Sequence, residues 1–480
     1  MIFLASAARV KVWKNRANRP KKNSRKTPAI IRRSFLSGAR RKLPVPQCDR
    51  PDSGASSKAA GFAEHANTTR APDSDMTAIT IFCLSYLGIA LGKIPGLVID
   101  RVGVAMLGAI GMVVFGVVTP ERAVRAIDLP TILLLYSLMI ISAQLRLGGF
   151  YTWVALKTVS LYTHPRLFLL VTMGVSALLS AILANDIVCF AFTPVLALSL
   201  VEAKLNPLPF LIGLAVSSNI GSAATIIGNP QNMLIGQSGQ LDFARFFFWC
   251  TPPSLLALLA SYLIILWLYR YKIYDSEKQA DGIWQHPIQP FNKWQTSKGI
   301  LAILILIGLF FSSIPREISA IGIAGVLLCS RRLKTRDIMG LVDWHLILLF
   351  CALFVIVHSV SQGNYLDMVV NRLAGAGLNL QNLPVLAGVS VILSNLFSNV
   401  PAVMLLLPVL DPSDPIQWYT LAASSTFAGN LFLLGSIANL IVVEQAANFG
   451  IKITFWQHAA AGIPVTLVSL LVLVGWILLV

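Results

Sequence analysis

The chain has 480 residues, of which 56% are hydrophobic and only 12% are charged, with a mean hydropathy of +0.72. Soluble domains carry about 25% charged residues, so this composition excludes an ordinary soluble protein and predicts a membrane protein. Most of the formal net charge of +17 lies before residue 76, where 17 Lys and Arg stand against 5 Asp and Glu, and the mildly basic remainder has no stripe suited to nucleic acid.

The first predicted element is a basic tail, residues 1–75, rich in Arg, Lys, Ser and Pro and without an acidic residue before Asp49. Three interpretations stay open: a disordered arm, an organelle transit peptide, or upstream sequence translated from a start codon assigned too early. Met76 stands immediately before the first hydrophobic span and after the acidic cluster Asp73-Ser74-Asp75. This order favours the misassigned start.

Residues 76–271 are predicted as the first of two membrane repeats, because apolar runs that cross or nearly cross about 30 Å of hydrocarbon recur there. One long run is split by Asn185-Asp186, and the next is broken at Gly228–Asn232. The predicted helical segments are Ala78–Leu91, Val102–Val118, Leu129–Leu145, Leu167–Leu200, Leu208–Ile227 resuming to about Gly236, and Pro253–Tyr269.

A polar segment, residues 272–298, is predicted as a cytoplasmic linker, and residues 299–480 as a second repeat with the same order of elements. Here too a long run is split, at Asn399, and the following run is broken at Gly435–Asn439. The predicted segments are Gly299–Phe311, Ile318–Cys329, Leu346–Val360, Leu383–Leu410, Trp418–Ala447 and Trp456–Val480.

The two halves align on their polar positions, which indicates a duplication. Asp128-Leu129-Pro130 at the start of one apolar run matches Asp343-Trp344-His345 at the start of another. Further matched positions follow at nearly constant offsets: Asn185 with Asn399, Ser217-Ser218 with Ser424-Ser425, Gly228 with Gly435, and Asn232 with Asn439.

The predicted fold is an all-α polytopic membrane protein with two inverted-topology repeats, each holding five crossings, a re-entrant hairpin and a broken helix. In the second split run, the arm Val400–Leu410 would be roughly 16 Å long as a helix, too short to span the hydrocarbon. Positive charge places one set of loops in the cytoplasm and Met76 outside, so a basic tail before Met76 would have to cross the membrane against the same rule. The cytoplasmic set is Lys93, Arg101, Arg146, Lys157, Arg166, Lys204, Arg270, Lys272 and Arg331–Arg336.

Asparagine, serine and glycine are costly inside a lipid-facing helix, yet here they interrupt corresponding runs in both halves. A helix that stops in mid-membrane exposes N–H groups at one end and carbonyl groups at the other. Two hairpin tips that meet two broken helices would form a polar cage, in which oxygens suit a hard cation such as Na⁺ and N–H groups suit an anion. Packing alone explains a single serine in a membrane helix, but it gives no reason for matched breaks.

Three runs resemble the ion transporter superfamily, which contains arsenite permeases, citrate transporters and sodium–dicarboxylate symporters. The runs are Ala184-Asn185-Asp186-Ile187-Val188, Ser218–Ser222 leading into Gly228–Asn232, and Gly429-Asn430-Leu431 with Gly435–Leu440. The resemblance covers essentially all of residues 76–480. It implies an elevator-type carrier, often a homodimer, in which a moving part holds both hairpins and both broken helices.

The resemblance also implies a substrate and ion site at the tips Ala184-Asn185-Asp186 and Ser398-Asn399-Val400. In the dicarboxylate branch a Ser-Asn-Thr tip binds substrate carboxylates and sodium; the asparagines match here and the threonines do not. Sodium-type positions that match are Ser180, Asn185 and Gly228 in one half and Ser394, Asn399 and Gly435 in the other. The candidate binding residues are Ser180, Asn185, Asp186, Ser217, Ser218, Asn219, Gly228, Asn229, Asn232, Ser394, Ser398, Asn399, Thr426, Gly435, Ser436 and Asn439.

Asp186 separates the substrate classes. An ionised carboxylate there would repel a carboxylate substrate, by about 4 kcal/mol at roughly 4 Å and an effective dielectric of about 20. Asp186 therefore holds a cation, carries a proton, or faces a neutral substrate such as arsenous acid. The Ala-Asn-Asp tip is closer to the arsenite permease pattern than to the dicarboxylate pattern.

The predicted function is secondary active transport of a small anion or oxyanion, coupled to Na⁺ or H⁺, across the inner membrane of a bacterial cell. A cation/proton antiporter of the same superfamily is the alternative, since Asp186 would serve it too. A remote alternative is an intramembrane hydrolase that uses Ser217 or Ser218 with His358. No Walker A, H-E-x-x-H or C-x-x-C motif occurs in the sequence, so neither ATP-driven transport, nor a cofactor, nor an enzyme is expected.

Overall fold

The computed structural model describes residues 72–92, 98–271, 290–362 and 377–480, together with positions 368, 372 and 375. Within these residues the regular elements are helices, and no strand occurs. Seven of the described helices are long and apolar enough to cross a membrane by length and composition. The prediction of an all-α polytopic membrane protein is confirmed, whereas the tail before residue 72 and linker residues 272–289 lie outside the described residues.

The helices of the first half follow the predicted apolar runs closely. The run predicted to reach Val118 ends earlier, at Val114, because the chain turns at Gly116 with a positive φ of 70°. Two short helices, α4 and α6, were not expected, since neither is long enough to cross a membrane. The elements are α2 Pro72–Leu91, α3 Arg101–Val114, α4 Pro120–Ala126, α5 Leu129–Leu147, α6 Phe150–Val159, α7 Pro165–Ile182, α8 Asn185–Glu202, α9 Leu208–Ser222, α10 Pro230–Ser238 and α11 Phe243–Leu268.

In the second half, both predicted interruptions divide helices as expected. The first helix begins at Lys293, inside the segment predicted as a linker, because the side chain of Asn292 caps it by accepting from the N–H of Gln295. The elements are α12 Lys293–Phe310, α13 Arg316–Leu328, α14 Thr335–Met339, α15 Trp344–Ser361, α17 Leu383–Phe397, α18 Asn399–Leu406, η1 Leu407–Val409, α19 Pro415–Ala428, η2 Leu433–Gly435, α20 Ile437–Ala447 and α21 Phe455–Leu479.

The packing of the helices repeats between the halves. In the first half α2 packs on α3, and α7 and α8 pack on α9; in the second, α12 packs on α13, and α17 and α18 pack on α19. Across the halves, α5 packs on α13 as α15 packs on α3, and α8 packs on α20 as α18 packs on α10. If each helix is replaced by its counterpart in the other half, every one of these packed pairs becomes another pair of the same set. A duplicated chain requires this. The opposite insertion of the two halves in the membrane stays a prediction.

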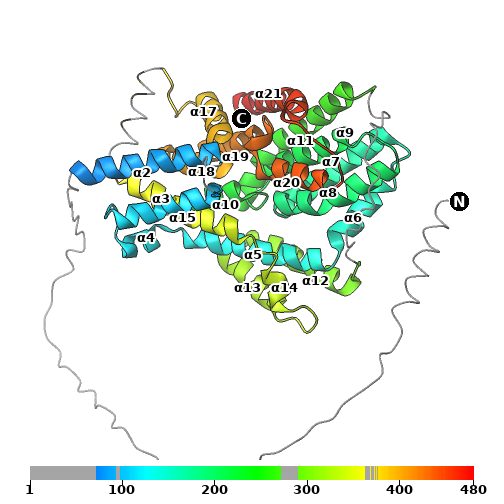
Figure 1. Cartoon of the computed structure of the whole chain (residues 1–480), viewed down its shortest axis with the longest axis horizontal. Coiled ribbons are helices and arrows are strands. Elements are labelled where there is room, and N and C mark those ends of the chain that lie inside the picture. The colour runs from blue at the N-terminus through cyan, green and yellow to red at the C-terminus, as the bar shows by residue number, and fades with distance from the viewer. Residues whose placement is uncertain are drawn as a thin grey trace, which may run out of the picture. The chain divides into compact units, whose positions relative to one another are not determined.

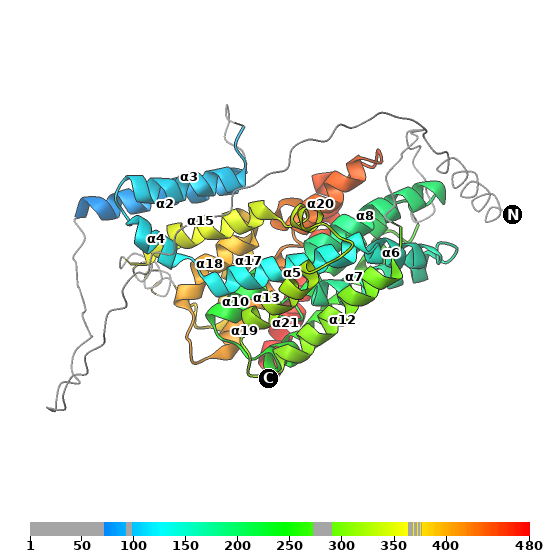
Figure 2. The same ribbon diagram turned by 90° about the horizontal axis from the view of Figure 1, so that it is seen from below.

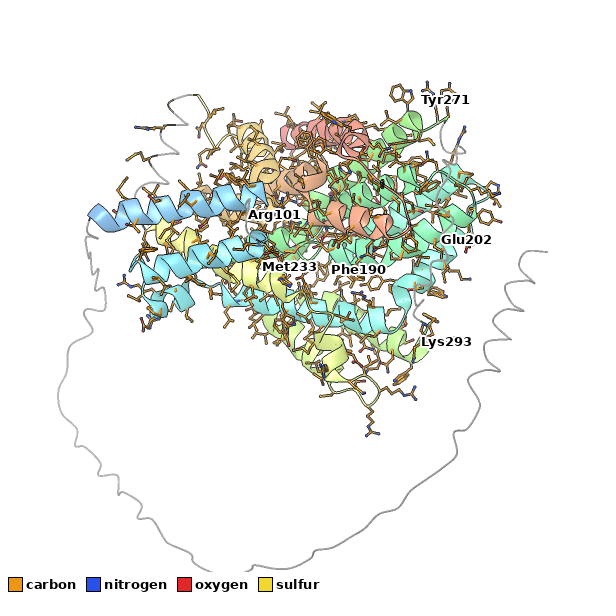
Figure 3. All side chains as sticks on the ribbon, in the orientation of Figure 1. Arg101, Phe190, Glu202, Met233, Tyr271 and Lys293 are labelled. Atoms are coloured by element: carbon orange, nitrogen blue, oxygen red, sulfur yellow. The ribbon has the colours of Figure 1, made fainter. Side chains whose placement is uncertain are left out.

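The hairpin arms pack on the broken helices, α7 and α8 on α9 and α17 and α18 on α19. Figure 1 shows α2, α3 and α15 together at the left and α5, α12 and α13 along the bottom, with the hairpins and broken helices above and to the right of them. Figure 2 shows α12 and α13 beside α5. Met233 on α10, labelled in Figure 3, is fully buried, whereas Tyr271 beyond the end of α11 is 79% exposed. Helix α11 also exposes a row of large apolar side chains: Leu255, Leu256, Leu259 and Leu263. A lipid-facing surface accounts for such a row.

Candidate functional site

Two helical hairpins turn inside the molecule. In the first, α7 ends at Ile182 and α8 begins at Asn185. In the second, a single residue, Ser398, separates α17 from α18. Its backbone has φ 80° and ψ 160°, a region that residues other than glycine rarely enter, so this tip stores strain.

Each broken helix is held open by an asparagine of its second segment. Asn232 and Asn439 occupy matched positions on α10 and α20, and each amide bridges two carbonyls at the interruption. Asn232 Nδ2 donates to the carbonyls of Ser222 (3.3 Å) and Thr225 (3.0 Å), and Asn439 Nδ2 donates to the matched carbonyls of Gly429 (2.8 Å) and Phe432 (3.3 Å).

The first hairpin tip is tied to the first broken helix by hydrogen bonds. The N–H of Asn185 donates to the carbonyl of Gly228 (3.2 Å), and its Nδ2 donates to Asn219 Oδ1 (3.1 Å). The Ser218 hydroxyl donates to the carbonyl of Asn185 (3.2 Å) and lies 2.8 Å from the Ser180 hydroxyl. These residues, all predicted from the sequence, lie together.

The second tip is tied to the glycine of the second broken helix by the side chain of its asparagine, where the first tip uses the backbone. With the Asn399 amide oriented so that its nitrogen faces the neighbouring carbonyls, Nδ2 donates to the carbonyls of Gly435 (3.1 Å) and Ser425 (3.2 Å). Its Oδ1 accepts from Gln231 Nε2 of the first half (3.3 Å). In both halves, the tip asparagine is therefore fastened to the glycine at the break.

Serine pairs join the first hairpin arm to the broken helix in each half. The hydroxyls of Ser176 and Ser217 lie 2.5 Å apart, and those of Ser390 and Ser424 lie 2.6 Å apart. Ser217 thus has a partner in the packing of α7 on α9. His358, on α15, has Gln362 Nε2 at 2.8 Å and is not brought to either serine by these contacts, so a hydrolytic Ser–His pair has no support.

Asn219 joins the two halves. Its Oδ1 accepts from Asn185 Nδ2 and from the Ser436 hydroxyl (2.9 Å), while its Nδ2 donates to Asn430 Oδ1 (2.9 Å) and Asn439 Oδ1 (3.2 Å). The first hairpin tip and the second broken helix thus share one buried amide. Asn430 Nδ2 is also buried and has no hydrogen-bond partner among the described residues.

Thr426 occupies the matched place in the second half. Its hydroxyl accepts from Asn229 Nδ2 (3.2 Å) and Gln231 Nε2 (3.4 Å), and it lies 3.4 Å from Asn232 Oδ1. Asn229 and Ser436 are the N-caps of α10 and α20. Each N-cap therefore reaches across to the other half, Asn229 to Thr426 and Ser436 to Asn219.

The second half contains a small space bounded by oxygen atoms. Asn395 Oδ1 is buried without a partner among the described residues, and a Cβ placed on Gly435 would lie 2.9 Å from it. The same Cβ would lie 3.2 Å from the carbonyl oxygen of Gly429 and 3.5 Å from that of Ala428. The nearby Ser394 hydroxyl is likewise buried and unpartnered. Hard cations prefer such oxygen ligands, so these residues fit a small cation such as Na⁺.

The matched space in the first half is closed. Ala181 stands where Asn395 stands in the second half. A Cβ on Gly228 would lie 2.2 Å from the carbonyl oxygen of Ser222 and 2.7 Å from its Cα. Of the predicted sodium-type positions there, Ser180 is satisfied by Ser218, and Asn185 Oδ1 alone is buried without a partner in the described chain.

Asp186 lies in the first turn of α8, next to the tip, and its side chain is partly exposed. Its charged neighbour is Asp343, whose carboxylate caps α15 by accepting from the N–H of Leu346 (3.0 Å). The matched residue of the second tip is Val400, so the two tips differ in charge at this position.

Four further residues of the network were not among the predicted set. Gln231, Asn395 and Asn430 lie inside the polar runs that signal the breaks, so their residue types were a usable signal. His458 was not signalled, because it lies on α21, outside both breaks. It is 2% exposed, and its Nε2 lies 3.2 Å from the carbonyl oxygen of Asn430. Because a carbonyl only accepts, this Nε2 carries the proton.

Comparison with known proteins assigns the class. The citrate transporter family matches residues 86–428. The chain belongs to this family. It is therefore an integral membrane transporter and not an enzyme, and the predicted place in the ion transporter superfamily is confirmed.

Curated relatives cover most of the chain. The silicon efflux transporter LSI3 of Oryza sativa subsp. japonica is 28% identical over 446 residues, with 78% of this chain and 92% of the relative covered. The inner membrane protein YbiR of Escherichia coli is 32% identical over 384 residues, covering 78% and 94%. A 46 kDa membrane protein of Mycobacterium leprae is 29% identical over 420 residues, covering 82% and 96%.

Proposed function

We propose that this transporter is a secondary active carrier of a small anion or oxyanion, coupled to Na⁺ or H⁺, that works by elevator-type alternating access. The observation that carries the proposal is the set of hydrogen bonds that Asn219 and Thr426 make between the two halves. Through these two residues, both broken helices and the first hairpin tip form one hydrogen-bonded unit, to which Gln231 fastens the second tip. Such a unit is suited to move as one body and to carry its ligands with it.

The chemistry of the unit favours a cation and an anion together. Unpartnered oxygens of Asn185, Ser394 and Asn395 suit a hard cation. Four helices, α8, α10, α18 and α20, begin at the two tips and the two breaks. Helix N-termini carry partial positive charge, which favours an anion. The buried Nδ2 of Asn430 supplies a further donor without a partner among the described residues.

The separation of cation-binding oxygens from anion-binding N–H groups suggests how the two ligands would be coupled in transport. Closing the unit without a cation would leave the oxygens of Ser394 and Asn395 buried and unpaired, which costs about 1–3 kcal/mol for each group. A bound cation removes that cost and adds positive charge beside the anion. The cation gradient would thereby drive the anion, because the loaded unit crosses more readily than the half-loaded one.

The test is transport by the purified protein in liposomes under imposed Na⁺ and pH gradients, with arsenite, citrate, succinate, sulfate and silicic acid as the panel. We expect one chemical class to accumulate only while one of the two gradients is present. Equal uptake with and without both gradients would contradict secondary active transport. The homodimer implied by the resemblance is checked on the same preparation by its mass in solution.

A cation/proton antiporter is the second candidate, and Asp186 favours it, because a charged tip residue without a hydrogen-bonding partner among the described residues is suited to exchange a proton for a cation. Asp186→Asn should then abolish the pH dependence of transport, and Asp186→Glu should retain it. If the carrier is instead a cation-coupled carboxylate symporter, Asp186→Asn should strengthen anion binding by removing repulsion. The inner-membrane placement predicted for the chain agrees with the name of its Escherichia coli relative.

A further inference from the structure

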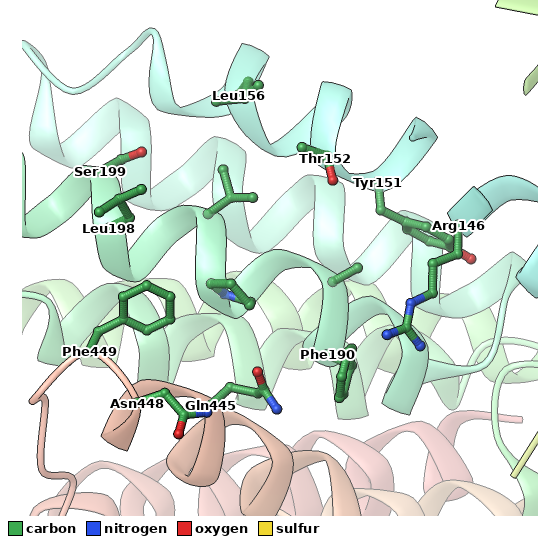
Figure 4. A pocket seen from close by; sticks show the side chains of 13 residues that line it. Arg146, Tyr151, Thr152, Leu156, Phe190, Leu198, Ser199, Gln445, Asn448 and Phe449 are labelled. Carbon is green, nitrogen blue, oxygen red and sulfur yellow. The ribbon is translucent and has the colours of Figure 1, made fainter. Parts of the chain in front are cut away.

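A cavity of about 420 Å³ lies apart from the network at the breaks. One wall is the end of α5 with α6, and the opposite walls are α8 and the C-terminal end of α20 (Figure 4). Its polar side chains include Arg146, Thr152, Ser199, Gln445 and Asn448, and none of the described residues that line it is acidic. Its volume falls in the range of small-molecule sites, about 300–1,000 Å³.

Arg146 gives the cavity its charge. Its guanidinium carbon lies 4.2 Å from the centroid of the Phe190 ring, and no hydrogen bond or ion pair joins it to another described residue. A guanidinium stacked on an aromatic face keeps its N–H edge free, and that edge matches the two oxygens of a carboxylate or an oxyanion. Figure 4 shows Gln445 and Asn448 on the facing wall, where their amides supply further donors.

The cavity is close to the candidate site in sequence and structure. Phe190 lies one helical turn beyond Asp186 on α8, and Gln445 lies on the broken helix that Ser436 caps at the network. The neighbouring helix ends carry Lys157 and Lys204, two of the charges that predict the cytoplasmic side.

We propose that this cavity is an anion-binding vestibule on the cytoplasmic side, in which Arg146 holds a small mono-, di- or tricarboxylate or an oxyanion between the breaks and the cytoplasm. The identity of the ligand as transported substrate rests on the proposed function, whereas the binding of an anion does not. A bound anion would contact α5 and α6 on one side and α8 and α20 on the other, so it would also resist movement of the hairpins against the flanking helices.

Charge-selective labelling of a cysteine in the cavity tests the proposal without any transport measurement. Thr152→Cys is introduced into the full chain in inverted vesicles of phosphatidylcholine alone, which removes anionic lipid headgroups as occupants. Its reaction rates with a sulfonate-bearing and a trimethylammonium-bearing methanethiosulfonate are compared. We expect the sulfonate reagent to be favoured, by a ratio that falls about tenfold when Arg146→Gln is added. Arg146→Lys should keep most of the preference, and Thr163→Cys, on an exposed turn between Lys157 and Arg166 on the predicted cytoplasmic side, serves as the control position.

The occupant is identified by protection. Citrate or succinate should slow the labelling of Thr152→Cys, and should lose that effect in Arg146→Gln. If only anionic lipid, added back to the vesicles, slows the labelling, the cavity is a lipid site and the vestibule proposal is wrong. An unchanged reagent ratio in Arg146→Gln would overturn the anion site altogether. Failure of liposome transport with normal anion-selective labelling would instead count against the proposed function alone.

Discussion

The first half-site pairs Ser180 with Ser218 and Asn185 Nδ2 with Asn219, and of these groups only Asn185 Oδ1 is buried without a partner among the described residues. The second leaves both Ser394 Oγ and Asn395 Oδ1 buried without partners in the same part of the chain. The backbone framework of the two is nevertheless the same, down to the asparagine that bridges each break. Duplication has therefore kept the geometry that holds the helices open and allowed the side chains to diverge. The difference points to the second half as the cation-accepting one.

The tips differ in a second way. The first carries a charge, Asp186, beside a tip of ordinary backbone conformation, whereas the second has Val400 beside the strained Ser398. Strain in a buried turn persists only where the surroundings impose it, and it gathers at ligand-binding segments. The two tips therefore differ both in charge and in backbone strain.

The largest contrast is expected between Gly228→Ala and Gly435→Ala. In the first half, the added methyl would meet backbone atoms of Ser222 at 2.2 and 2.7 Å, so the break cannot form and folded protein should be lost. In the second half, it would meet the end of the Asn395 side chain at 2.9 Å, which can move, and would fill the oxygen-lined space. This variant should fold. We expect its half-saturating Na⁺ concentration for thermal stabilisation to rise at least about tenfold.

Size-exclusion profiles and melting curves at several Na⁺ concentrations measure both effects. A comparable folded yield for the two variants would contradict the claim that the first half-site is closed and the second is open. Unchanged thermal stabilisation of Gly435→Ala by Na⁺ would show that the cation site does not lie in the second half.

Asn219→Ala should have the next largest effect. Four buried groups, on Asn185, Asn430, Ser436 and Asn439, lose their partner, at about 1–3 kcal/mol for each group left unsatisfied. Transport should fall at least about 100-fold, because even about 2.7 kcal/mol of that cost corresponds to this factor. Thr172→Val is the matched control, since the Thr172 hydroxyl is buried without a partner in the described chain. Similar activity in both variants would show that these hydrogen bonds between the halves are dispensable.

Ser398→Gly should have the smallest effect and the opposite sign. Glycine adopts φ 80° and ψ 160° without the steric cost that serine bears, so the free energy of unfolding should rise by about 1 kcal/mol. Ala184→Gly, at the matched and unstrained position, should lower it instead. Thermal unfolding of the two variants in one detergent measures the pair, and a rise for both would contradict the difference in strain.

The sequence was sufficient for the fold and for most of the network, for identifiable reasons. Apolar runs specify membrane helices by length, and Asn, Ser and Gly are rare enough in such runs that Asn185 and Asn399 mark the tips. The matched offsets then predicted which residues occupy equivalent positions in the two halves. Short helices such as α6 escaped prediction, because their length fits no membrane crossing.

Other features depend on three-dimensional packing and left no pattern in the chain. His458 reaches the carbonyl of Asn430 only because α21 packs against α19. The stacking of Arg146 on Phe190 joins α5 to α8 across a cavity that no local sequence predicts. Which half-site stays open likewise depended on the single exchange of Ala181 for Asn395, whose meaning appears only once Gly435 is placed beside it.

The most direct test of the account is transport by Asn185→Ala and Asn399→Ala in liposomes under the gradient that drives the wild-type protein. The side-chain amide of Asn185 donates to Asn219 Oδ1, and that of Asn399 donates to the carbonyl of Gly435. Each variant should therefore insert and fold but lose at least about tenfold in transport rate, from unsatisfied groups costing about 1–3 kcal/mol. If both variants transport like the wild type, the matched breaks are structural, and the site proposed for this transporter lies elsewhere.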